Sequence, residues 1–148
     1  IMNERRKIPL AQVIAFAASV PSTTSGSLNR SIPLNPNSIT LSQFGFYLSE
    51  NADRIFLDGT IGVQAAIINP TVTFRIFDEN NRLVFSTTEQ FQLSIGQVQT
   101  VSFRAIDSAR PAGFRVYTLT ASSTDLLPIL TGATVTGPLN FSALALKN

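Results

Sequence analysis

The sequence predicts a single all-β domain, because short stretches of alternating apolar and polar residues recur along the chain with turn residues between them. These stretches lie about 8 to 12 residues apart, and no stretch convincingly shows the apolar period of a helix. About eight to ten antiparallel strands at that spacing indicate a β-sandwich or a barrel. The length of 148 residues suits one such domain with one core.

The composition limits the possible partners. Charged residues make up 14% of the chain, against roughly 25% in an ordinary soluble domain, and hydrophobic residues make up 44%. Such a weakly charged surface is either covered by other subunits or rich in hydroxyl groups, and the first interpretation predicts an oligomer. The net charge of +2 comes from residues 4 to 7 alone. The rest of the chain is neutral, so we expect no nucleic-acid partner.

Residues 1 to 21 predict either an extended N-terminal arm or the first strand. The basic start and the apolar stretch from Ile8 to Val20 have the pattern of a signal peptide. That stretch is too short for a membrane span, which needs about 20 apolar residues. Val13, Ile14 and Phe16 favour extended structure. The strand joins either its own domain or the sheet of a neighbouring subunit, and the sequence leaves both open.

A loop or linker follows over residues 22 to 38, and the body of the domain extends from residue 39 to residue 148. Its first strand, Ile39 to Leu48, alternates strongly. Arg54 to Ala66 predicts a longer strand, in which two glycines, Gly59 and Gly62, indicate a bulge or a close backbone approach.

Two hairpins and a final pair of strands complete the predicted domain. The first hairpin runs from Thr71 to Phe91 around a turn at residues 78 to 81. For the second we predict a strand Gln97 to Ala105, a corner at residues 107 to 113 and a return along Phe114 to Ser122. The last two strands, Leu126 to Val135 and Leu139 to Leu146, are predicted to be separated by a turn at Gly137 and Pro138.

The residues that commonly carry chemistry are missing. Without His or Cys, the common catalytic triads, thiol nucleophiles and imidazole or thiolate metal sites are impossible. Carboxylates close in sequence remain, namely Asp53 with Asp58 and Asp78 with Glu79, but turn formation accounts better for most of them. With no Trp and only Tyr47 and Tyr117, the sequence gives a sugar-stacking role weak support. We expect no enzyme, no catalytic residue, no cofactor and no metal.

A set of short segments carries a family resemblance: Ile14 to Ser19, Gln43 to Phe46, Pro111 to Gly113 with Tyr117 to Leu119, and Phe141 to Leu146. They resemble the bacterial jelly-roll domains of spore-surface proteins, found in the exosporium and in spore appendages and similar in architecture to tumour necrosis factor and the globular heads of complement. The resemblance implies a ten-stranded jelly-roll sandwich, a tight homotrimer and a structural role. Family members often follow a collagen-like stalk, whereas this chain has no Gly-X-Y repeat, which leaves a different role for the N-terminal arm.

We therefore predict a self-assembling structural protein of the cell or spore surface. Its main partner is itself, as a homotrimer and in a fibre joined by the N-terminal strand, with other surface-layer proteins as further partners. The alternative is a receptor- or glycan-binding head of a phage tail fibre or adhesin. The predicted assembly interface consists of Leu10, Val13, Ile14, Phe16, Tyr117, Leu119, Leu144 and Leu146.

Overall fold

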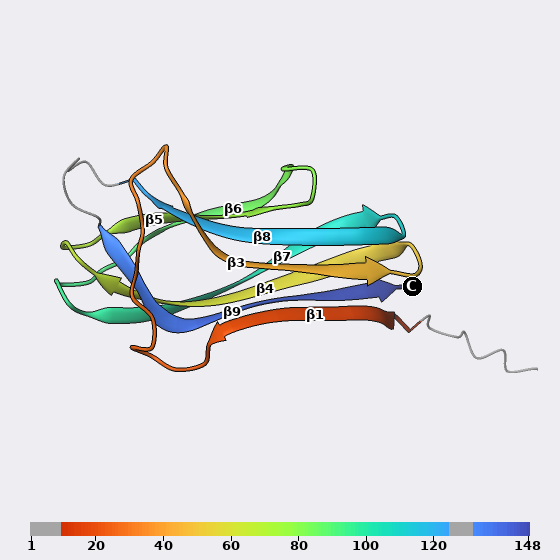
Figure 1. Cartoon of the computed structure of the whole chain (residues 1–148), viewed down its shortest axis with the longest axis horizontal. Coiled ribbons are helices and arrows are strands. Elements are labelled where there is room, and N and C mark those ends of the chain that lie inside the picture. Colours follow the sequence, from red (N-terminus) through yellow and green to blue (C-terminus); the bar gives the residue numbers. More distant parts are fainter. Residues whose placement is uncertain (1–9, 125–131) are drawn as a thin grey trace, which may run out of the picture.

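The computed structural model describes residues 10–124 and 132–148, which form two antiparallel sheets packed face to face (Figure 1). Within these residues there are nine strands: β1 (Gln12–Ser22), β2 (Arg30–Ser31), β3 (Ile39–Leu48), β4 (Ala52–Ala65), β5 (Thr71–Phe77), β6 (Leu83–Gln90), β7 (Val98–Arg110), β8 (Gly113–Ser123) and β9 (Ala133–Lys147).

The strand order is that of a jelly roll. Sheet A has the order β1-β9-β4-β7, with β2 also paired to β9, and sheet B has the order β3-β8-β5-β6. Strands that follow one another in sequence mostly change sheets, and only β5 and β6 pair as sequence neighbours. Two antiparallel sheets connected in this way define the jelly-roll class of sandwich. The predicted single antiparallel β-sandwich is therefore confirmed.

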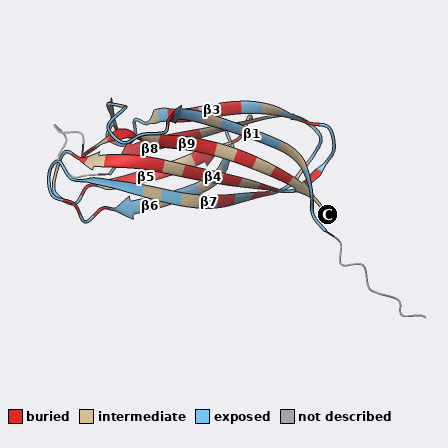
Figure 2. Cartoon of the chain, turned by 90° about the horizontal axis from the view of Figure 1, so that it is seen from below, coloured by how far each residue is buried: buried red, intermediate tan, exposed pale blue. Residues whose placement is uncertain are grey.

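The core lies between the two sheets because each strand sends alternate side chains inward. Buried segments concentrate on β4, β8 and β9, whereas β1, β6 and β7 are mostly half-buried or exposed (Figure 2). Two groups of aromatic rings fill the space between the sheets. One group consists of Phe44, Phe46, Tyr117 and Phe141, and the other of Phe74, Phe85 and Phe103.

Several local predictions are confirmed. Strand β3 has the predicted bounds, and β5 and β6 form the first predicted hairpin around the turn at residues 78 to 81. Of the bulge or close backbone approach predicted at the β4 glycines, the backbone approach is present at Gly62, whereas Gly59 is approached by a side chain. A Cβ atom on Gly62 would lie 1.9 Å from the carbonyl oxygen of Gly137, and one on Gly59 would lie 2.5 Å from the ring of Phe103.

The second predicted hairpin is wrong. Strand β7 pairs with β4 in sheet A, whereas β8 pairs with β3 and β5 in sheet B. The connection between them, Pro111 and Ala112, therefore carries the chain from one sheet to the other. Alternation predicts which side chains share a face, but it says nothing about which strand lies alongside.

The predicted turn at Gly137 and Pro138 is also wrong, because both residues lie inside the long strand β9. Gly137 has a φ of 94°, and the pairing of β9 with β4 shifts register between Ile61 and Val63. A proline is tolerated there because an irregular position does not need its missing N–H. Of the predicted strand Leu126 to Val135, residues 126 to 131 lie outside the described residues, and β9 begins at Ala133.

The N-terminal segment contributes a strand to its own domain. From Gln12 onward β1 pairs with β9 of the same chain, next to the edge of β3. The basic start of the chain and the residues around Met2 lie outside the described residues. Between β1 and β3, the predicted loop contains the short strand β2.

Candidate functional site

A row of apolar side chains crosses the outer face of sheet A. Phe16 of β1 lies opposite Leu144 of β9, Leu144 lies opposite Phe56 of β4, and Phe56 lies opposite Ile106 of β7. Directly opposed residues of an antiparallel sheet project to the same face. The row therefore crosses β1, β9, β4 and β7, the four long strands of sheet A. Together with the neighbouring opposed pair Val13 and Leu146, we call it the apolar stripe.

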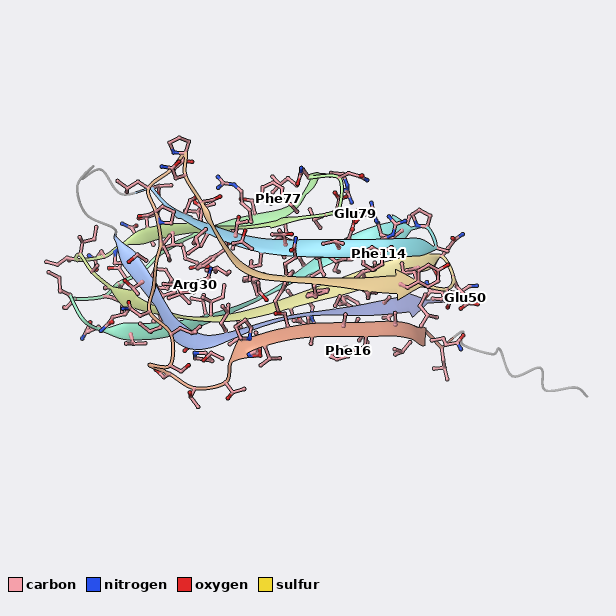
Figure 3. The ribbon with its side chains drawn as sticks, in the orientation of Figure 1. Phe16, Arg30, Glu50, Phe77, Glu79 and Phe114 are labelled. Atoms are coloured by element: carbon pink, nitrogen blue, oxygen red, sulfur yellow. The ribbon has the colours of Figure 1, made fainter. Side chains whose placement is uncertain are left out.

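The apolar stripe is open to solvent in the isolated chain. Phe16 is 66% exposed, Val13 57% and Ile106 52%, while the other three members are half-buried. Phe16 points away from the sandwich below β1 (Figure 3). Isolated exposed apolar residues are common on soluble proteins, but a contiguous set across a whole sheet marks a surface that contacts another molecule.

Charged side chains border the apolar stripe, and one of them, Arg54 of β4, lies directly opposite Leu146. The guanidinium carbon of Arg104 lies 5.3 Å from the ring centre of Phe56, within the range of a cation–π contact. Arg104 Nε also donates a hydrogen bond of 2.7 Å to Asp58 Oδ1. An apolar centre with a polar rim is the usual composition of a protein–protein interface.

The outer face of sheet A is large enough for such an interface. Its four strands lie about 4.8 Å apart, and the 15 residues of β9 extend it to roughly 50 Å, which gives roughly 900 Å² before curvature is considered. A standard interface buries about 800 Å² on each partner. One face of this sheet therefore supplies the area that a stable contact between subunits requires.

The structure brings together four of the eight predicted interface residues. Val13, Phe16, Leu144 and Leu146 all belong to the apolar stripe. Leu10 lies just before β1 and is 87% exposed, whereas Ile14 packs against the core.

Tyr117 and Leu119 have to be removed from the predicted interface. Both side chains are fully buried between the sheets, because β8 is a central strand of sheet B and these residues are on its inner face. Sequence reasoning missed Phe56 and Ile106. Their strands were predicted, but the periodicity alone does not show which of the two faces points outward.

A buried network of charged side chains closes the space between the β5–β6 turn and the β7–β8 corner. Asp78 and Asp107 have side chains that are 1% and 4% exposed, and Arg110 is 12% exposed. Arg110 donates to Glu79 at 2.7 Å and lies 3.5 Å from Asp107. Arg82 bridges Asp78 and Asp107 at 2.9 Å each, Arg115 pairs with Glu79, and the Tyr117 hydroxyl donates to Asp107 at 2.7 Å.

The network is electrically balanced, because three guanidinium groups face three carboxylates. Burial alone raises the pKa of Asp78, but hydrogen bonds from the backbone of Arg82 and Asn80 and from the Arg82 side chain outweigh it, so this pKa lies below its ordinary value. Burial, together with the hydrogen bond to Asp107, raises the pKa of Tyr117 well above its ordinary value. At neutral pH the Asp78 carboxylate is therefore ionised, and the Tyr117 hydroxyl keeps the proton that it donates to Asp107.

The carboxylates singled out in the sequence are engaged in structural contacts. Asp78 and Glu79 belong to the network, and Asp58 pairs with Arg104. Asp53 accepts a hydrogen bond from the backbone N–H of Asn148 at 2.6 Å. In the described part of the chain, no group of acidic residues is arranged to hold a metal ion. The same residues include no helix long and apolar enough to cross a membrane.

Comparison with known proteins shows the fold. No protein-family model and no curated protein matches the sequence. Among solved structures, the chain is similar to the protein of T=1 particles derived from infectious bursal virus, with a TM-score of 0.57 and 8% identity over 88% of this chain. It is also similar to the Gt strain of infectious bursal disease virus, with a TM-score of 0.55 and 9% identity over 88% of this chain. In both cases the chain spans about a third of the other protein, 31%.

A third similarity covers both chains almost completely. Eiger TNF from S. frugiperda matches with a TM-score of 0.53 and 12% identity over 93% of this chain and 95% of that chain. At such low identity these similarities concern the fold alone. They show that the chain has a jelly-roll fold, which it shares with Eiger TNF and with the viral proteins.

Proposed function

We propose that this chain is a non-enzymatic structural subunit that assembles with copies of itself into a surface layer or an appendage fibre. The observation that carries the proposal is the apolar stripe, which leaves a contiguous apolar row exposed on a chain with few charges. Its three most exposed side chains are between 52% and 66% exposed, so burying the remainder would contribute roughly 3 to 5 kcal/mol at about 1.5 to 3 kcal/mol for each full side chain, before the costs of association are subtracted. That gain favours a contact between subunits.

The proposed assembly is a homotrimer on the surface of a spore or cell. Its support is the sequence resemblance to spore-surface domains, together with a fold shared with Eiger TNF and with proteins of virus particles. Three chains of 16.0 kDa have a mass of about 48 kDa, which distinguishes a trimer from a monomer or dimer.

The test compares the solution mass of the wild-type chain with that of two matched variants by light scattering. The double variant Phe16→Glu/Ile106→Glu places charges in the apolar stripe and is expected to be monomeric. The control Phe114→Glu changes a similarly exposed aromatic residue on sheet B and is expected to remain a trimer. A monomeric wild-type chain, or a stripe variant that keeps the wild-type mass, would contradict the proposal.

The surface location needs a separate measurement. Antibodies against the chain should label intact spores or cells of the source organism without permeabilisation, and negative-stain images of the purified chain should show fibres or sheets. Labelling that requires permeabilisation would place the protein inside and remove the surface role.

The proposed link through the N-terminal strand can be tested with engineered disulfides, because the chain has no Cys of its own. Ala18 of β1 lies opposite Ser142 of β9, so the variant Ala18→Cys/Ser142→Cys places two thiols within reach of each other. If β1 is exchanged between subunits, oxidation yields covalent multimers. If β1 stays in its own domain, as it lies in the structure, oxidation yields cross-linked single chains and the strand does not join subunits.

A further inference from the structure

The outer face of sheet B carries a pair of exposed aromatic residues at one end of the sandwich. Tyr47, near the end of β3, lies directly opposite Phe114, near the start of β8. Tyr47 is 70% exposed and Phe114 62%. Phe114 and Glu50 lie toward the same end of the molecule in Figure 3. This pair is on the sheet opposite the apolar stripe, so the proposed subunit contact does not account for it.

The ring of Phe114 rests on bare backbone. A Cβ atom on Gly45 would lie 2.6 Å from Phe114 Cζ, so the ring extends over the position where any other residue would have a side chain. Since the side chain is nevertheless mostly exposed, it is supported by the sheet and remains open to solvent. Phe114 and Tyr47 are therefore two exposed rings on neighbouring strands of this face, which we call the platform; Tyr47 lies shortly before the β3–β4 turn and Phe114 shortly after the β7–β8 corner.

The same two loops form a shallow hollow of about 460 Å³. The β3–β4 turn contributes Asn51, and Asn51 Oδ1 accepts a 2.8 Å hydrogen bond from the backbone N–H of Ala112 in the β7–β8 corner. This hydrogen bond fixes the two loops to each other. The hollow is lined by Asn51, Ala52, Asp53, Ala109, Arg110 and Pro111.

The polar groups of the hollow suit a ligand rich in hydroxyl groups. Arg110 is already engaged by Glu79, Asp107 and Asp78, so it is not available to a ligand. Within the described residues, the amide nitrogen of Asn51 and the hydroxyl of Tyr47 donate no hydrogen bond, and the Asp53 carboxylate accepts only one. The groups left for a ligand are therefore an amide, a carboxylate and a hydroxyl, all of which form hydrogen bonds with hydroxyl groups.

We propose that this end of the sandwich binds a neutral saccharide, with a sugar ring stacked on Phe114 and Tyr47 and its hydroxyls bonded to Asn51 and Asp53. A pyranose has an apolar face of C–H groups, which suits the electron-rich face of an aromatic ring. Its rim of hydroxyls both donates and accepts hydrogen bonds, which matches an amide beside a carboxylate. The hollow falls within the volume range of small-molecule sites, roughly 300 to 1,000 Å³. The site is independent of the proposed assembly function.

The intrinsic fluorescence of the intact chain provides a direct assay. The chain contains no Trp and two Tyr residues, and Tyr117 is fully buried, so a ligand in solution reaches only Tyr47. We would titrate the wild-type chain with galactose, rhamnose and N-acetylglucosamine at millimolar concentrations and follow tyrosine fluorescence. Saccharide proton signals under saturation transfer provide a second readout that does not depend on Tyr47.

Three variants locate the binding. Phe114→Ala is expected to weaken saccharide affinity about tenfold or more, because the ring that carries the stacking contact is lost. Phe114→Tyr keeps the ring and should retain binding. Phe16→Ala removes an equally exposed aromatic residue, 66% exposed, from the other sheet and should leave binding unchanged. Circular dichroism confirms that each variant is folded.

Each alternative outcome overturns the proposal. If none of the saccharides binds, or if Phe114→Ala and Phe16→Ala bind as the wild type does, there is no saccharide site at this platform. If acrylamide fails to quench Tyr47 in the assembled protein, a second copy of the chain covers the platform and the saccharide assignment is wrong. None of these results depends on the oligomeric mass, so a failure here is distinct from a failure of the assembly proposal.

Discussion

The buried charge network leads to a quantitative prediction about Asp107. The substitution Asp107→Asn keeps the shape of the side chain but leaves the network with three guanidinium groups and two carboxylates. Removing one partner from a buried ion pair typically costs about 3 to 5 kcal/mol, because the remaining charge is buried without compensation. Here Arg110 keeps Glu79 at 2.7 Å and Asp78 at 3.6 Å, so the cost falls toward the lower end.

Each contact of Asp107 contributes to the expected value. The side chain of Arg82 is 51% exposed, so water can solvate its charge when Asp107 is replaced. Losing the ion pair between Arg82 and Asp107 therefore costs less than about 1 kcal/mol. The hydroxyl of Tyr117 can still donate to the amide oxygen, but a hydrogen bond to a neutral acceptor contributes about 1 kcal/mol less than one to a charge. The buried charge of Arg110 also loses part of its compensation, which adds a further cost. In total we expect Asp107→Asn to lower the free energy of unfolding by about 2 to 4 kcal/mol. The melting temperature should fall by roughly 4 to 16 °C.

Chemical denaturation followed by circular dichroism measures this loss, and Asp58→Asn is the matched control. Asp58 also pairs with an arginine, but the two side chains are 43% and 63% exposed. Its substitution should cost less than about 1 kcal/mol. If Asp107→Asn proves as mild as Asp58→Asn, the network does not stabilise the fold in the way described and the reasoning is refuted.

Three further predictions concern the fold. The pKa of Asp78 is lower in the folded chain than in the unfolded chain, so the free energy of unfolding should fall as the pH drops below about 4. The variant Asp78→Asn should show a weaker dependence of this free energy on pH. An unchanged pH profile in the variant would contradict this prediction. Gly62→Ala should lower the free energy of unfolding in denaturant by about 3 kcal/mol or more, because the new Cβ would overlap backbone atoms. Gly45→Ala should cost about 1 kcal/mol, because only the movable ring of Phe114 is displaced. Equal costs for the two variants would refute the argument. Phe141→Ala should cost about 3 to 5 kcal/mol in a melting or denaturant series, since the ring is fully buried 4.8 Å from that of Phe44, and a loss below about 1 kcal/mol would show that the cluster is not tightly packed.

Local pattern was sufficient for most strands and for the turns that close within a few residues. Strand β3 could be placed to the residue because its apolar positions alternate over its whole length. The β5–β6 hairpin followed from two alternating runs around four turn residues. The glycines of β4 could be interpreted as a bulge or a close approach because glycine in a strand interior marks one or the other, and Gly62 shows both.

The candidate sites were only partly predictable. The apolar run of β1 and the alternating end of β9 indicated Phe16 and Leu144. Phe56 and Ile106 complete the apolar stripe only because β4 and β7 lie beside β9 in sheet A, and that neighbourhood depends on residues far apart in the sequence. Tyr117 and Leu119 were misassigned for the same reason, since a central strand buries one face that an isolated strand would expose.

The sequence by itself determined that this chain forms an all-β domain, that it lacks the imidazole and thiol groups of common active sites, and that it carries few charges. Those properties depend on composition and on a two-residue period, which any short window contains. The tertiary structure alone decided which strands are neighbours, which faces point outward, and that Asp78 and Asp107 share one buried network. Strand pairing and burial arise from contacts between distant segments, so a local pattern cannot specify them.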